Sequence, residues 1–266
     1  MNRLEQSEKQ KNMWKNRVSN EIKLAIEVQR KLMPERDMEN YPVYGLNIPA
    51  REISGDFYDF YPHDDQIYFN LSDVSGKGVN AGMVMAKAIT LFQIFARQKY
   101  KPNEILFEMN NDLKQTNPRG TFVTSIIGRY NLKTDEVELA NAGHQPALVK
   151  TGDDFIEYPS SSTPLAVIKQ KNENVYKLEK FKLNSSRVYC FTDGFSESLD
   201  ENNNEIGIDG VKELLKKHQN SKLKIELQKA TEEIRQKSLK KEYKEKGVKE
   251  DEAILDDDLT IVGIGK

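Results

Sequence analysis

The chain has 266 residues, of which 37% are hydrophobic and 31% charged, so it is long enough to bury a core yet polar for a globular protein. Its net charge of −2 is unevenly spread, because residues 1–36 carry +4 and residues 211–251 carry +5, which leaves −11 for the remainder. An acidic body of this kind suits bound cations better than nucleic acid, so we expect no nucleic-acid partner.

A single cysteine, Cys190, excludes an internal disulfide framework and a cysteine-rich zinc site. We expect Cys190 to be a small core residue. No stretch approaches the roughly 18 consecutive apolar residues of a membrane span. The N-terminal residues lack the apolar segment of a signal peptide. These features predict a cytoplasmic protein without a membrane span.

Residues 1–33 contain no Gly or Pro and are rich in Glu, Lys and Gln, which predicts a helix that ends before Pro34. We interpret this segment as an N-terminal linker or coupling helix ahead of a main domain at 34–266. Two interpretations of the helix stay open: it packs on the main domain, or it pairs with a second copy or with a sensor protein. A stripe of residues spaced four and three apart runs along it; its members are Val18, Ile22, Ala25, Gln29 and Leu32.

The rest of the chain predicts a series of strands and two pairs of helices. Helices are predicted from Val79 onwards, over 103–115 with Asn103 as the N-cap, and twice between 210 and 246. Sequential strands with helices in two pairs predict antiparallel sheet flanked by helices. Runs rich in β-branched and aromatic residues predict the strands, which cover residues 43–48, 66–73, 121–130, 137–140, 147–150, 155–158, 175–183, 187–192 and 259–264.

Four acidic motifs share a local pattern, in which an Asp stands beside Gly or another Asp at the end of a strand-like run. A single Asp-Gly pair usually marks a turn, but four such sites at strand ends can converge in space. Converging carboxylates repel one another unless cations neutralise them, and hard oxygen ligands suit Mg²⁺ or Mn²⁺. The pattern fits two-metal phosphoryl chemistry. The motifs are SGDFYD at 54–59, SDVSGKG at 72–78, FTDG at 191–194 and DDDLT at 256–260.

From these motifs the chain is identified as resembling a known family, the bacterial SpoIIE/RsbU-type branch of the PPM (protein phosphatase 2C-like) serine/threonine phosphatases, over about residues 24–264. The resemblance implies an α+β fold with a central antiparallel β-sandwich flanked by helices on both faces, and it makes 34–266 the phosphatase domain. Seven blocks in the expected order carry it: VQRKLMP at 28–34, AREISGDFYDF at 50–60, SDVSGKGVNA at 72–81, TFVT at 121–124, NAGHQP at 141–146, FTDG at 191–194 and DDLT at 257–260.

The resemblance also implies the ligands of two divalent cations, Mn²⁺ or Mg²⁺. Asp73 would bridge both metals. Asp56 and the backbone carbonyl of Val74 would complete one metal site, and Asp193 and Asp257 would complete the other. The four Asp side chains are thus the expected catalytic residues.

Four further residues are expected to act less directly. Asp258 follows a ligand and is expected to orient it or a metal-bound water. Asp59 is acidic and nearby, but the resemblance places it outside the ligand set. Lys77 either steers phosphate or is an ordinary solvated turn lysine. His144 either works as a general acid or is a hydrogen-bonded turn residue.

Several features refine or depart from the family pattern. Thr192 and Thr260 are expected to donate hydrogen bonds to the carboxylates beside them. The branch commonly has Gly where this chain has Ser54 and Ala166. The Lys/Glu-rich segment 219–254 is either a substrate-docking surface or a solvated helix.

The resemblance implies metal-dependent hydrolysis of phosphoserine or phosphothreonine on a partner protein. The implied substrate is a phosphorylated STAS-domain anti-anti-sigma factor in a bacterial partner-switching pathway. One alternative is a catalytically silent regulator with the phosphatase fold, which binds a partner without turnover. Another is a two-metal phosphohydrolase that acts on a small molecule or a nucleotide.

Overall fold

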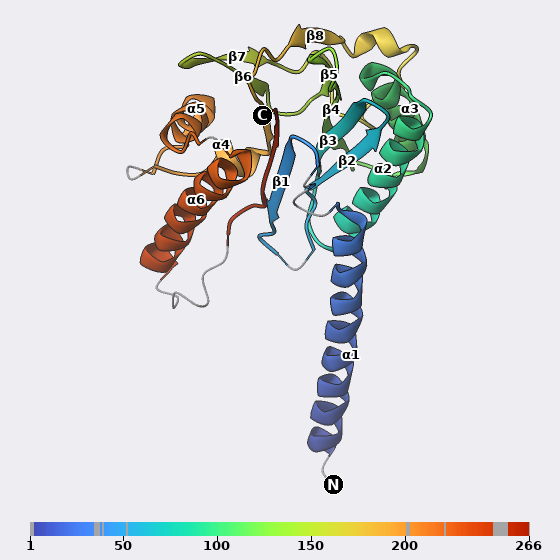
Figure 1. Cartoon of the computed structure of the whole chain (residues 1–266). Helices are drawn as coiled ribbons and strands as arrows, with labels where there is room; N and C mark the ends of the chain where they lie inside the picture. The colour runs from blue at the N-terminus through green and yellow to red at the C-terminus, as the bar shows by residue number, and fades with distance from the viewer. Residues whose placement is uncertain are drawn as a thin grey trace.

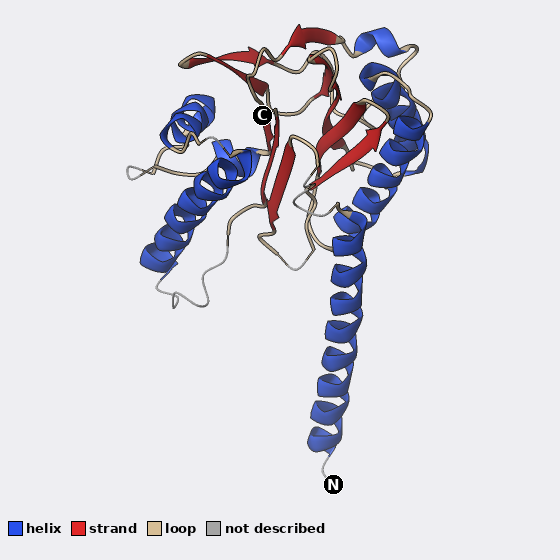
Figure 2. Ribbon diagram, viewed as in Figure 1, coloured by secondary structure: helices blue, strands red, loops and turns tan. Residues whose placement is uncertain are grey.

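A computed structural model describes residues 3–34, 38, 40–51, 53–200, 203–220, 222–246 and 255–265, with the side chains of 3–5 and 240–246 left aside. Two five-stranded antiparallel sheets form its centre (Figures 1 and 2). The first sheet has the order β1 (Val43–Ile48), β10 (Leu259–Ile264), β9 (Val188–Phe191), β6 (Ala147–Thr151) and β7 (Asp154–Tyr158). The second has the order β2 (Phe57–His63), β3 (Gln66–Val74), β4 (Val123–Asn131), β5 (Glu136–Ala142) and β8 (Glu179–Lys182).

The two sheets pack face to face through a buried apolar layer. Because successive strand residues point to opposite faces, Phe69 and Leu71 of β3 enter this layer, whereas Tyr68 faces the helices. Val262 and Cys190 face them from the first sheet, which confirms Cys190 as a core residue. The layer fixes how the strand ends of the two sheets meet.

Helices cover both outer faces of the sandwich. The second sheet is covered by α2 (Val79–Arg97) and α3 (Pro102–Thr116), and the first by α4 (Asp193–Ser196), α5 (Gly207–Lys217) and α6 (Leu223–Lys246). The predicted fold, a central antiparallel β-sandwich flanked by helices on both faces, is therefore confirmed.

The apolar composition of α2 has a structural reason. This one described helix is long and apolar enough to cross a membrane by length and composition alone. One side of it packs on the second sheet, where Met85, Ile89 and Phe92 are fully buried. A core helix satisfies the same criterion, so the composition gives only weak support for a membrane span.

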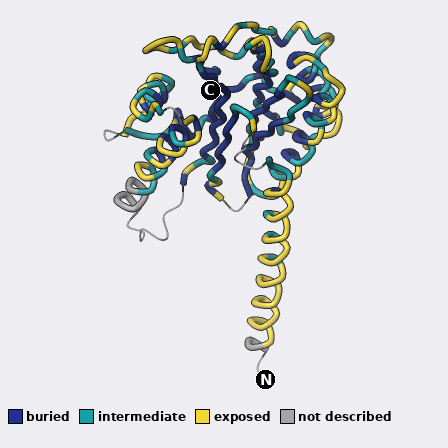
Figure 3. Tube along the Cα trace, viewed as in Figure 1, coloured by how far each residue is buried: buried dark blue, intermediate teal, exposed yellow. Residues whose placement is uncertain are grey.

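Helix α1 (Arg3–Leu32) projects away from the sandwich, and most of its length is exposed (Figures 1 and 3). Met13 and Trp14 are 65% and 66% exposed, and Ala25 of the predicted stripe is exposed too. Among the side chains of 6–32, only Gln29 is buried. The helix thus packs on the sandwich only near its C-terminal end. The division at residues 33 and 34 into two units stays a prediction.

Two local predictions differ from the structure. Helix α3 begins one residue early, at Pro102, so its N-cap is Lys101 rather than Asn103. The reason is that Pro suits the first helical position, and the Glu104 carboxylate accepts a hydrogen bond from the Lys101 backbone N–H at 2.7 Å. The strand expected over 175–183 shortens to β8, and Glu173–Val175 forms a 3₁₀ turn instead.

A buried ion pair joins α6 to the first sheet. Arg187, just before β9, pairs with Glu226 of α6, and both side chains are buried. The Tyr189 hydroxyl donates a second hydrogen bond to Glu226, at 2.6 Å. Removal of the carboxylate would leave buried polar groups without this acceptor.

We therefore predict that Glu226→Ala lowers the free energy of unfolding by about 3 kcal/mol, because breaking a buried pair leaves its partner uncompensated. Urea denaturation followed by circular dichroism measures the change. The matched control is Glu232→Ala on the same helix, where an exposed carboxylate lies 3.4 Å from Arg235; its cost should stay below about 0.5 kcal/mol. Equal effects of the two substitutions would contradict this role for Glu226.

Candidate active site

The four acidic motifs lie at one end of the sandwich. Asp56 directly precedes β2 and Asp73 lies near the end of β3; the ladder pairs Phe57 with Ser72, so these two Asp residues are neighbours. Asp193 follows β9 and Asp257 precedes β10, and the ladder pairs Phe191 with Ile261. Because antiparallel partners bring the end of one strand beside the start of the next, each sheet contributes one pair of carboxylates.

Gly55 permits a close approach of the predicted ligands. A methyl group at this position would lie 2.9 Å from the Val74 carbonyl oxygen and 3.4 Å from Asp73 Oδ1. The Val74 N–H donates to the Gly55 carbonyl at 3.3 Å, which ties the two segments together. The carbonyl and carboxylate assigned to the metals by resemblance therefore border the same small space.

Asp56 is buried and held by two hydroxyl groups. Thr192 Oγ1 and Thr260 Oγ1 donate to Asp56 Oδ2 at 2.7 and 2.6 Å. The expectation that each threonine serves the carboxylate beside it, Asp193 or Asp257, is thus wrong. Both side chains reach across from the first sheet instead, and they fix the orientation of a carboxylate at the edge of the second.

The pKa values of these carboxyl groups reflect burial and mutual repulsion. Burial, then the charges of Asp73 and Asp258, raise the pKa of Asp56 well above its ordinary value. Burial, then Asp193, raises the pKa of Asp73 to about 7. Burial, then Asp257, raises the pKa of Asp193. The protein thus holds acidic groups together against their repulsion.

This donor set fits hard divalent cations. It consists of carboxylates and a backbone carbonyl, which are oxygen ligands of the kind Mg²⁺ and Mn²⁺ prefer. Within the described ranges, no group of three or more His, Cys, Asp or Glu side chains is placed so that it could by itself hold a metal ion. An ion here would take the rest of its shell from the carbonyl and from water, as Mg²⁺ commonly does.

Asp258 positions the segment before Asp56 with its side chain, and its backbone N–H donates to Asp257 Oδ1 at 2.9 Å, which agrees with the expected orienting role. Asp258 Oδ1 accepts the Ala50 N–H at 2.7 Å, and its Oδ2 accepts the Ser54 hydroxyl at 2.6 Å and the Gly55 N–H at 3.0 Å. These bonds hold the segment that leads into Asp56. The hydroxyl of Ser54, where the family commonly has Gly, thus has a defined partner.

Asp59 faces α2 rather than the converging carboxylates, and His144 is enclosed in the protein. Asp59 Oδ2 accepts a hydrogen bond from Gln93 of α2 at 2.7 Å, and burial raises the pKa of Asp59 to about 6. His144 is buried, its Nδ1 lies 2.8 Å from Thr124 Oγ1, and burial lowers the pKa of its imidazole to about 4. These contacts support the interpretation of His144 as a buried, hydrogen-bonded turn residue.

Two contacts near the site were not foreseen from the sequence. Gln29 of α1 donates from Nε2 to the Ser54 carbonyl at 2.7 Å and accepts the Ser54 N–H at 3.2 Å. Its place on an otherwise apolar stripe was the only available signal. Lys77 Nζ lies 3.3 Å from Asp257 Oδ1, so Lys77 is neither unpartnered nor directed purely at solvent.

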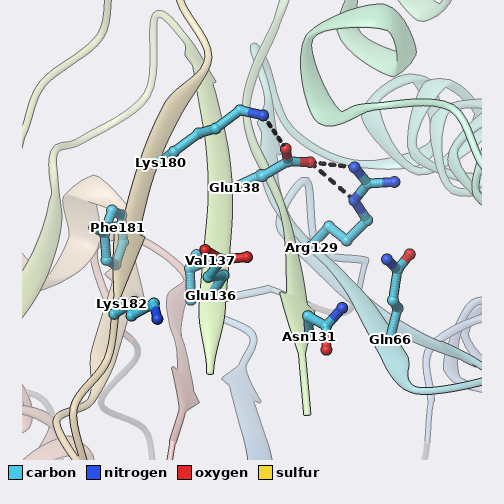
Figure 4. A pocket seen from close by; sticks show the side chains of 9 residues that line it. All are labelled: Gln66, Arg129, Asn131, Glu136, Val137, Glu138, Lys180, Phe181 and Lys182. Carbon is cyan, nitrogen blue, oxygen red and sulfur yellow. Dashed lines mark hydrogen bonds and ion pairs between the residues drawn. The ribbon is translucent and has the colours of Figure 1, made fainter. Parts of the chain in front are cut away.

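A polar cavity of about 440 Å³ lies at the opposite end of the second sheet (Figure 4). Gln66 at the start of β3 borders it, whereas Asp73 stands near the end of that strand. Inside it, Glu138 pairs with both Arg129 and Lys180. These charges already compensate one another, so the cavity is not the proposed reaction site.

Comparison with known proteins places the chain in a family. Residues 63–265 match the family described as Stage II sporulation protein E (SpoIIE). The chain belongs to the SpoIIE family. The matched range contains Asp73, Asp193 and Asp257 and begins after Asp56.

Individual relatives agree with this assignment. The chain is 24% identical over 187 residues to phosphoserine phosphatase RsbU of Bacillus subtilis (strain 168), an alignment that spans 70% of this chain and 56% of RsbU. The chain thus spans about half the length of that curated relative. The SiaA-PP2C domain of Pseudomonas aeruginosa has the same fold, with a TM-score of 0.79, 17% identity, and coverage of 95% and 98% of the two chains.

A second solved structure shares the fold. The PP2C phosphatase domain of SpoIIE from Bacillus subtilis, with a fragment of its regulatory domain, gives a TM-score of 0.66 at 18% identity, over 85% of this chain and 64% of that one. The SpoIIE-family chain therefore has the PP2C-type architecture that its motifs led us to expect.

We predict a pH dependence of stability that originates at Asp73. Its pKa is about 7 in the folded protein and about 3.8 in the unfolded chain, so its protonated form stabilises the fold, and this stabilisation is lost as the pH rises through 7. Without metal, the free energy of unfolding should therefore fall by about 0.8 kcal/mol more between pH 6.5 and 8 in the native protein than in Asp73→Asn. Urea denaturation in EDTA at both pH values tests this. The same pH dependence in both proteins would refute it.

Proposed function

We propose that this chain is a metal-dependent protein phosphatase that hydrolyses phosphoserine or phosphothreonine on a partner protein. The observation that carries the proposal is the convergence of two carboxylate pairs, Asp56 with Asp73 and Asp193 with Asp257, at one end of a PP2C-type sandwich. Membership of the SpoIIE family and the similarity to RsbU, a protein named as a phosphoserine phosphatase, support it.

The proposed metal roles are those that the family resemblance implies for these residues. Asp56 and the Val74 carbonyl would hold one cation, Asp193 and Asp257 would hold the other, and Asp73 would serve both. When bound, two Mn²⁺ or Mg²⁺ ions supply an acidified water and positive charge for the transferring phosphoryl group.

Other residues keep the ligands in place. Thr192 and Thr260 orient the Asp56 carboxylate by hydrogen bonds to one of its oxygens. Asp258 and Gln29 hold the backbone of Ser54 and Gly55 just before it. No thiol is required as a nucleophile, and Cys190 is buried in the core between the sheets.

For the substrate, we propose a phosphorylated STAS-domain protein of a partner-switching pathway in the cytoplasm. The support is the similarity to RsbU and to a solved chain described as containing RsbU and RsbW domains, which gives a TM-score of 0.65 at 20% identity. Phosphate release from a phosphorylated STAS protein, a phosphoserine peptide and a nucleotide, compared in one assay, separates this proposal from a small-molecule phosphohydrolase.

We predict that Asp73→Asn reduces phosphate release by on the order of 10³-fold in saturating Mn²⁺, because it removes the carboxylate shared by both cations. The matched control is Asp65→Asn in the turn between β2 and β3, where the half-buried Asp65 pairs with Lys133, and this substitution should not affect turnover. Circular dichroism checks that both variants are folded. Near-normal turnover by Asp73→Asn would overturn the assignment, and metal-independent binding of the STAS protein without phosphate release would favour the silent regulator.

We also propose that α1 couples the site to a second copy of the chain or to a sensor protein. The support is the exposure of Leu24 and Val28, at 63% and 60%, on a helix that reaches the site through Gln29. An apolar surface of this kind on a projecting helix is typical of an interaction face.

Deletion of residues 1–23 tests the coupling, because it removes the projecting part of α1 and keeps Gln29. We expect the truncated chain to lose self-association in sedimentation velocity, or to lose its response to an added sensor, and to change its rate of phosphate release. Leu24→Glu with Val28→Glu should reproduce the effect, whereas Lys23→Glu at an exposed position of the same helix should not. Unchanged activity and oligomeric state after the deletion would exclude the coupling role.

A further inference from the structure

Lys77 lies in the turn that follows β3, within the most acidic part of the molecule. Gly76 and Gly78 on either side have φ values of +95° and +80°, a left-handed conformation that favours glycine. The turn directs the lysine toward the segment before β10. There its Nζ donates to the Asp256 carbonyl at 3.0 Å and lies 3.3 Å from Asp257 Oδ1.

The ammonium group contacts only one of the two carboxylate pairs, through Asp257. Burial and Asp257 raise the pKa of Asp193, whereas Lys77 acts in the opposite direction, as a nearby cation must. Besides burial, the pKa of Asp73 is shifted only by other carboxylates, and that of Asp56 by other carboxylates and two threonine hydroxyls. The Asp193–Asp257 pair therefore has a lysine that partly compensates its negative charge, whereas the Asp56–Asp73 pair has none among the described contacts.

We propose that Lys77 is a tethered counter-cation of the Asp193–Asp257 half of the site, which competes with the divalent ion there and makes that half the weaker binding site. This inference rests on the proposed function. Asp257 would hold a divalent ion through a carboxylate oxygen, and an ammonium group 3.3 Å from Oδ1 repels a second cation bound there. Lys77 therefore opposes an ion at Asp257 by its charge, whereas the described contacts place no lysine on Asp56 or Asp73.

Calorimetric titration of the full chain with Mn²⁺ tests the proposal without requiring turnover. The native protein should bind in two unequal steps, and Asp257→Asn should abolish the weaker one. Lys77→Met should tighten the weaker step by about five-fold, the size expected for a half-exposed ion pair, and leave the tighter step unchanged.

Two controls isolate the charge of Lys77. Lys77→Arg keeps the positive charge and should bind like the native protein. Lys99→Met removes a lysine that pairs with Asp64 at 3.0 Å on the surface, and it should change neither step.

The proposal is wrong if Lys77→Met leaves the weaker step unchanged or weakens it, if Lys77→Arg tightens it as much as Lys77→Met, or if no variant binds Mn²⁺. Phosphate release is measured separately on the same samples. A chain that shows the expected binding but releases no phosphate would refute the proposed function and leave the role of Lys77 intact.

Discussion

The electrostatic repulsion among carboxylates at one end of the sandwich is the constraint on which the site depends. Asp56, Asp73 and Asp193 gather there beside Asp257, although burial disfavours the charged form of the first three. They stay together because they stand at the ends of strands whose apolar faces form the core between the sheets. The free energy of that packing, together with hydroxyl donors such as Thr192 and Thr260, holds an arrangement that the carboxylates alone would not adopt. Divalent ions would turn this repulsion into attraction, which is why a two-metal site is the most economical explanation of the arrangement.

The fold and the acidic motifs could be predicted from the sequence because their signals are local. Strand alternation and the Pro and Gly positions depend on neighbours within a few residues, and so do the motifs that contain Asp56, Asp73 and Asp193. The predicted N-cap of α3 was wrong although its signal is equally local. Asn103 is a good N-cap in isolation, but Pro102 before it suits the first helical position better. Short-range patterns therefore predicted which helices and strands form. They missed the competition between Pro102 and Asn103 that decides where α3 begins.

Contacts between distant segments could not be predicted in this way. The threonines that bind Asp56 come from the other sheet, and their direction depends on how the two sheets pack. The pairing of Lys77 with Asp257 joins residues far apart in the chain. Gln29 occupies a position where the heptad-like rhythm suggested an apolar contact, yet its amide binds both backbone groups of Ser54. Each of these contacts depends on a geometry that exists only once the chain is folded.

The position of Gln29 has a mechanical consequence. Helix α1 has 30 residues, which corresponds to a length of about 45 Å. Among the side chains of 6–32, only Gln29 is buried, and it lies near the end of the helix that meets the sandwich. Such a helix is anchored at one end only, beside the strand ends that carry the acidic motifs. A force on the exposed part of α1 would therefore reach the sandwich at the peptide groups of Ser54, two residues before Asp56.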